Sequence, residues 1–158
     1  MKALSLWEPW ATLVRRGLKL YETRDWPMPE WLTDQPLAIH AAKKPYRAMD
    51  YEALFRRQLL MDEVDPFDLK YGCLLCVVHP QRSIKTGEAK TLLAQAEPER
   101  ANRELMYGYY DDIDPDTGKQ RWATKLNDIR VLPEPIPYTG HQGIFNWPEG
   151  DAIYQELW

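Results

Sequence analysis

The chain has 158 residues and a net charge of −4, with 44% hydrophobic and 28% charged residues, which is typical of one globular domain. It lacks the run of roughly 20 apolar residues that a membrane helix needs, which excludes a membrane-spanning protein. The acidic total disfavours a non-specific nucleic-acid binder, because such proteins usually carry a basic excess. Residues 1–60 nevertheless hold ten Lys or Arg against seven Asp or Glu, while residues 61–158 hold ten against seventeen, which predicts a localised basic site. No signal peptide opens the chain, so a cytoplasmic location is expected.

Glycine and proline divide the first part of the chain into predicted strands and helices. A strand is expected at 3–7, and Pro9 begins a helix, because the missing N–H of proline costs nothing in a first helical turn. Gly17 ends that helix. The next predicted elements are strands at 18–24 and 36–42 and a helix at 46–61.

The second part of the chain predicts a central strand and several edge elements. Residues 71–78 are nearly continuously apolar, as in a buried strand. Short strands separated by turns, with a few helices, predict an α+β fold built as a small mixed barrel with flanking helices. We expect a single domain over residues 1–158 with an acidic insertion around 86–120. The other predicted elements are a helix at 88–106, a turn at 114–118, strands at 121–132 and 141–147, extended prolines at 133–137 and a helix at 151–158.

Two motifs that could bind metal or undergo redox chemistry do not fit those functions. Cys73 and Cys76 lie three apart in a predicted strand, so they should face opposite sides and act as buried structural thiols. The acidic residues at 112, 114 and 116 resemble the start of a calcium loop. The sixth position is Thr117 rather than Gly and the twelfth is Ala123 rather than Glu, so an acidic solvated turn is predicted instead.

The histidines and the glycines indicate no cofactor. His40, His79 and His141 lack the spacing of metal ligands, and the chain has no P-loop, no GxGxxG and no GxSxG. We therefore expect neither a metal ion nor an organic cofactor. His40 lies in a predicted strand, where it could line a pocket, although a buried histidine with satisfied hydrogen bonds is the commoner case.

The most informative stretch follows Gly17, where Lys19, Glu22 and Arg24 occur within six residues. Strand alternation places Glu22 and Arg24 on one face with Leu18 and Leu20, a face that is otherwise apolar. Charges on such a face are costly unless they are paired and useful. Lys19 can join Glu22 only from the turn between helix and strand. The alternative is an ordinary ion pair on a surface strand, and the residues alone leave both open.

These residues match the G-x-K-x-x-E-x-R signature of the ASCH domain, a branch of the PUA-like superfamily, which the chain resembles. Residues 4–11 are similar to the family's opening L-S-[hydrophobic]-x-Q-P-W-A, and residues 37–44 to its next strand. The closing segment is similar over 132–137 and 140–143. Two departures weaken a phosphate-binding interpretation: Glu8 replaces the usual Gln, and residues 29–35 lack an Arg-Gly pair.

The resemblance implies a PUA-like barrel with a cleft between the first helix and the barrel, lined by the signature residues. ASCH members include RNA- or DNA-binding modules, ribonucleases and small amidohydrolases that remove the acyl group from N4-acetylcytidine. For hydrolysis in this cleft, Glu22 would be the base for water and Lys19 the partner of the oxyanion. Arg24 could orient Glu22 or bind the base carbonyl. The other expected substrate-binding residues are Ser5 as a polar contact, Trp7 and Trp26 as stacking surfaces, and His40 and Lys43.

We therefore predict a metal-independent amidohydrolase of N4-acylated cytosine or cytidine, with a small-molecule nucleoside or modified base as its partner. A non-catalytic reader of RNA or modified bases is the alternative, and a ribonuclease the third. RNA remains a second candidate partner, a membrane is not expected, and the chain should be a monomer or a weak homodimer. Five cations could bind RNA phosphates if they converged on one rim of the cleft: Lys43, Lys44, Arg47, Arg56 and Arg57. The alternative, which we expect, is that they lie on a solvated helix face.

Overall fold

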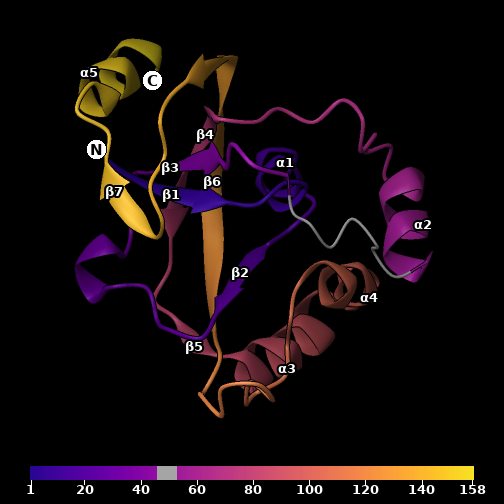
Figure 1. Ribbon diagram of the computed structural model, residues 1–158. Coiled ribbons are helices and arrows are strands. Elements are labelled where there is room, and N and C mark those ends of the chain that lie inside the picture. Colours follow the sequence, from indigo (N-terminus) through magenta and orange to yellow (C-terminus); the bar gives the residue numbers. More distant parts are fainter. Residues whose placement is uncertain (46–52) are drawn as a thin grey trace.

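The computed structural model describes residues 1–45 and 53–158 (Figure 1). Seven strands form one curled mixed sheet in the order β2-β6-β4-β3-β1-β7, with β5 paired to β6. Among the strand pairs of the described residues, β1 and β3 run parallel and the others antiparallel. The strands are β1 (Lys2–Leu6), β2 (Tyr21–Arg24), β3 (Leu37–Ala41), β4 (Cys73–Pro80), β5 (Ile84–Lys85), β6 (Trp122–Pro137) and β7 (Ile144–Asn146).

The helices lie around the sheet, which confirms the predicted α+β class with flanking helices. In Figure 1, α3 and α4 lie together beside β2 and β5, and α5 lies at the opposite end near both termini. The amino group of Met1 binds the carboxylate of Asp151 at 2.8 Å and so ties the two ends of the chain together. The helices are α1 (Trp10–Arg15), α2 (Ala53–Met61), α3 (Thr86–Ala96), α4 (Pro98–Tyr107) and α5 (Gly150–Leu157), with a 3₁₀ turn at Glu30–Leu32.

Several predicted boundaries move for local reasons. The predicted helix over 88–106 is two helices, because Pro98 begins a new one at α4. The strand predicted from residue 18 begins at Tyr21. The helix predicted over 46–61 is seen from Ala53, while residues 46–52, including Arg47, lie outside the described residues. Within the described residues, no helix is both long and apolar enough to cross a membrane.

The central strand β4 corrects the expected orientation of the two cysteines. Its pairing with β6 is irregular between Leu74 and Cys76, so the alternation of side chains shifts there. Cys73 and Cys76 therefore both pack in the main core, whereas Leu74 and Val77 belong to the second core cluster. Both thiols are free and buried, as predicted, and burial raises the pKa of Cys76 to about 12. The prediction of opposite faces was wrong.

A similar irregularity interrupts β6, the longest strand. Asp128 has a φ of 47°, a left-handed conformation that Asp tolerates better than most residues. Beyond it, Ile129 packs against the same core cluster as Leu126, although a regular strand would place residues three apart on opposite faces. The proline segment that follows is extended, as expected, and continues β6 to Pro137.

Candidate active site

A cleft opens where the ends of β1 and β3 face β2 and the loop at 138–143. Residues far apart in the sequence line it, since it also receives the end of α4 and the turn around Asp114. The structure thus brings together every residue that the sequence predicts for the site: Ser5, Trp7, Lys19, Glu22, Arg24, Trp26, His40 and Lys43.

Lys19 reaches the cleft from the turn between α1 and β2. Gly17 has a φ of 67°, and the amides of Leu18 and Lys19 both donate to the carbonyl of Leu13, which closes the turn. Lys19 Nζ donates to Glu22 Oε2 at 3.0 Å and to the carbonyl of Tyr21. The Lys19 side chain is only 2% exposed and that of Glu22 11%, so an ordinary surface ion pair is excluded.

Glu22 joins two cations. Its other oxygen, Oε1, lies 3.1 Å from Arg24 Nε, and Arg24 Nη2 donates to the carbonyl of Ser5 at 3.1 Å. The guanidinium of Arg24 also lies 4.9 Å from the ring centroid of Trp26. One face of Trp26 is therefore covered by Arg24, whereas Trp7 is 46% exposed in the cleft. Of these two indoles, Trp7 is the more exposed.

Ser5 and His40 form a second polar pair on neighbouring strands. Ser5 Oγ lies 3.0 Å from His40 Nδ1, and His40 Nε2 lies 3.0 Å from the carbonyl oxygen of Tyr138. Because a carbonyl can only accept, Nε2 carries the proton, and Nδ1 of the neutral ring accepts from the Ser5 hydroxyl. Burial lowers the pKa of His40 below its ordinary value of 6.5. Gly140 permits this packing, since a Cβ there would lie 2.2 Å from the imidazole.

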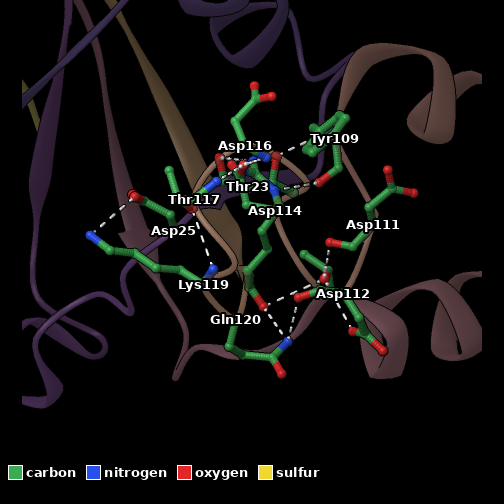
Figure 2. A network of polar contacts seen from close by, with 12 residues as sticks. Thr23, Asp25, Tyr109, Asp111, Asp112, Asp114, Asp116, Thr117, Lys119 and Gln120 are labelled. Atoms are coloured by element: carbon green, nitrogen blue, oxygen red, sulfur yellow. Dashed lines mark hydrogen bonds and ion pairs between the residues drawn. The ribbon is translucent and has the colours of Figure 1, made fainter.

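The rim of the cleft divides by charge. Lys43 and Lys44 line one part and form no ion pair with the described residues. Another part is acidic, with Asp25 and the turn around Asp114, shown in Figure 2. A cationic rim beside an acidic one suits a ligand that carries its negative charge on one side only.

The acidic turn uses its carboxylates to organise its own backbone (Figure 2). Asp114 Oδ1 accepts from the amides of Asp116 and Thr117 at 2.9 and 3.1 Å, and Oδ2 lies 3.3 Å from Arg121 Nη1. The two amides and the nearby guanidinium lower the pKa of Asp114. In the described part of the chain, no three His, Cys, Asp or Glu side chains gather as metal ligands would.

Sequence reasoning missed Glu104, a buried carboxylate on α4 that is 1% exposed. It accepts hydrogen bonds from the amides of Leu20 and Tyr21 at 2.8 and 2.9 Å and from the Tyr110 hydroxyl at 3.0 Å. Glu104 thereby holds the start of β2, the strand that carries Glu22 and Arg24. The sequence did contain a signal for its burial: Glu104 lies three residues from Ala101 and three from Tyr107, so all three share the buried face of α4.

Glu8, which replaces the usual Gln of the family pattern, does not lie in the cleft as that departure suggested. Its carboxylate accepts from the Thr12 amide at 2.9 Å and from the Thr12 hydroxyl at 2.7 Å, so it caps the start of α1. Glu8 is buried and is not among the residues that line the cleft. The expectation that it weakens anion binding in the cleft therefore has no structural basis.

Comparison with known proteins identifies the fold. No family model and no curated protein matches the sequence. The structure of the ASCH protein from Zymomonas mobilis matches over 99% of this chain and 93% of that chain, with a TM-score of 0.53 and 12% identity. Two variants of that protein match with TM-scores of 0.53 and 0.52, at 14% and 15% identity, over 99% of this chain and 94% and 96% of theirs. The chain therefore shares the fold of these ASCH structures.

Proposed function

We infer that this protein is an ASCH amidohydrolase that removes the acyl group from N4-acylated cytosine or cytidine without a metal ion. The observation that carries this proposal is the buried ion pair of Lys19 and Glu22, joined by the partly buried Arg24, which opens into a cleft beside an exposed Trp7. Burying a pair of charges is costly unless they serve a purpose, and groups of this kind are concentrated at functional sites. An acid–base pair next to a flat apolar surface suits an acylated nucleobase.

The chemistry follows from what each group can do. Glu22 takes a proton from water, whose oxygen attacks the acyl carbon. An ammonium has three N–H bonds, and Lys19 uses two of them for Glu22 and the Tyr21 carbonyl, which leaves one for the oxyanion. The carbon–nitrogen bond then breaks, and the exocyclic nitrogen of cytosine takes the proton from Glu22. Arg24 holds the carboxylate in position from the other side.

The test is hydrolysis of N4-acetylcytidine, followed by the change in ultraviolet absorbance. We expect turnover by the wild type and a loss of about 100- to 1,000-fold in Glu22→Gln and Lys19→Met, as for the loss of a placed catalytic donor. Methionine is chosen because it keeps the buried volume of Lys19. The thermal midpoint of each variant is measured as well, to show that the variant is folded. Glu134→Gln, an exposed carboxylate outside the cleft, is the matched control. Absence of turnover by the wild type, or full activity in Glu22→Gln, would contradict the proposal.

A non-catalytic reader of RNA or modified bases is the second candidate, and the two unpaired lysines on the rim favour it. A protein that grips single-stranded phosphates loses affinity with a log–log salt slope of about −0.7 per contact. Binding of an oligoribonucleotide is therefore measured at several salt concentrations, with N4-acetylcytidine as competitor, for wild type and Lys43→Ala/Lys44→Ala. Tight, salt-dependent binding that the nucleoside cannot displace favours the reader, and cleavage of the oligonucleotide favours a ribonuclease.

A further inference from the structure

The cleft holds a nucleophile and a base that the mechanism above leaves unused. Ser5 and His40 lie directly opposite each other on the parallel strands β1 and β3, and both line the cleft. Their side chains are within hydrogen-bond distance at 3.0 Å. Ser5 is partly exposed, whereas His40 is 1% exposed. The hydroxyl therefore meets the cleft while the imidazole lies behind it.

The pair has the parts that activate a serine. A serine nucleophile needs a neutral base within hydrogen-bond reach and a third group that fixes the base in its correct tautomer. The Tyr138 carbonyl is that third group, because it accepts from Nε2 and leaves Nδ1 free of a proton and directed at Ser5. The edge of the His40 ring also packs on Phe145, at 5.7 Å and 88°.

A cation lies on the backbone of Ser5. Arg24 Nη2 binds the carbonyl of Ser5 at 3.1 Å, so the guanidinium lies beside the serine. A guanidinium has five N–H donors, and among the described residues the Arg24 side chain donates a hydrogen bond only to the Ser5 carbonyl. Glu22, at 3.1 Å from Arg24 Nε, is therefore separated from Ser5 by a single side chain. A purely structural role for His40, in which the ring only satisfies its own hydrogen bonds, would require neither a partly exposed Ser5 nor Arg24 beside it.

We propose that Ser5 is a nucleophile activated by His40, and that the cleft transfers acyl groups from amides or esters to water through an acyl-serine. Ser5 Oγ bonds to the acyl carbon as its proton passes to His40 Nδ1. The bond from that carbon to the leaving nitrogen or oxygen breaks, and the leaving atom takes the proton from Nδ1. Water then attacks the ester as its proton passes to Glu22. The bond to Ser5 Oγ breaks, Oγ takes a proton from a second water in the cleft, and Glu22 returns its proton to that water as the carboxylic acid leaves.

This inference takes its natural substrate, an N4-acylated cytosine or cytidine, from the proposed function. It differs in the route, because direct attack by water is replaced by two steps. Glu22 keeps its role as the base for water, now in the second step. One consequence separates the two routes: Glu22→Gln should accumulate an acyl-serine if Ser5 attacks first. Direct attack by water leaves no covalent intermediate.

The first experiment is labelling with a fluorophosphonate probe, mapped by peptide mass spectrometry. The chain has two serines, Ser5 and Ser83, and Ser83 Oγ is bonded to the Met28 amide and to Thr124 away from the His40 pair. We expect one adduct, on Ser5, that is absent in Ser5→Ala and retained in Ser83→Ala. Labelling should be about 100-fold slower or more in His40→Gln, as for the loss of a general base. Absence of an adduct on Ser5, or an unchanged rate in a folded His40→Gln, would overturn the inference.

The second experiment uses N4-acetylcytidine and p-nitrophenyl acetate. We expect Glu22→Gln to gain one acetyl group on Ser5, seen as a mass increase, and Ser5→Ala to gain none. Full hydrolysis of N4-acetylcytidine by Ser5→Ala overturns the Ser5 inference but leaves the proposed function intact. An adduct on Ser5 from p-nitrophenyl acetate, without hydrolysis of N4-acetylcytidine by the wild type, supports the Ser5 inference and contradicts the proposed substrate. If His40→Gln does not fold, the wild-type adduct still decides, because a serine without a base does not react.

Discussion

Replacing Glu104 by alanine should destabilise the protein and loosen the strand that carries the candidate active site. The change removes the acceptor of three buried donors: the amides of Leu20 and Tyr21 and the hydroxyl of Tyr110. A buried donor left without a partner costs about 1–3 kcal/mol, so a loss of at least about 3 kcal/mol in the free energy of unfolding is expected for the three together. In a chain of this size, each kcal/mol lowers the thermal midpoint by about 2–4 °C.

The assay is thermal and urea unfolding of Glu104→Ala, Glu104→Gln and the control Asn102→Ala. Asn102 is exposed on the same helix, so its substitution should change stability by no more than about 0.5 kcal/mol. Glutamine keeps one acceptor oxygen and should fall between the control and alanine. The reasoning is refuted if Glu104→Ala unfolds at the same urea concentration as Asn102→Ala.

Three further predictions concern pH and ligand stacking. Burial raises the pKa of Glu8 above 4.5, so the folded state binds a proton more readily than the unfolded chain. The free energy of unfolding should therefore fall as pH rises above about 4.5, and it should fall less steeply in Glu8→Gln, as measured by urea unfolding. Burial lowers the pKa of His40, so stability should fall as pH drops below 6.5; His40→Gln should lose this dependence and His141→Gln should keep it, as measured by urea unfolding between pH 4 and 8. Trp7→Ala should weaken nucleoside binding by about 1–3 kcal/mol with little change in thermal midpoint. Trp26→Ala should weaken binding and also lower the thermal midpoint, because Trp26 packs on the core. Calorimetric titration measures the binding, and thermal melting the midpoint.

The residues expected for the site lie around one cleft because the signals that place them are local. Gly17 ends α1 in a left-handed conformation, and the turn that follows is short enough to bring Lys19 next to Glu22. A lysine in regular strand geometry would have pointed the other way, so the helix-to-strand turn is what assembles the pair. Proline and glycine also delimited most strands correctly, since their backbone preferences act without reference to the rest of the fold.

The errors arose where tertiary pairing overrides a simple period. An irregularity of one residue in β4 placed both cysteines in the same core, and the left-handed Asp128 did the same for Ile129 and Leu126. Neither position has a local composition that distinguishes it from a regular strand. Two of the partners of Glu104, the amides of Leu20 and Tyr21, are more than eighty residues away along the chain, a contact that no local pattern predicts.

The position of the cleft follows from the way in which the sheet curls. β2 and β1 are separated in the sheet by β6, β4 and β3, yet Arg24 at the end of β2 donates a hydrogen bond to Ser5 on β1. The curl therefore brings β2 across to β1, and a side chain, not a strand ladder, joins them. Because backbone pairing does not close this part of the sheet, the gap is left for side chains to line. Lys19, Glu22 and Arg24 border it from β2 and the preceding turn, and Ser5 and His40 from β1 and β3. A substitution of Arg24 therefore changes both the chemistry of the cleft and the link across the sheet, so activity and stability must be measured on the same variant.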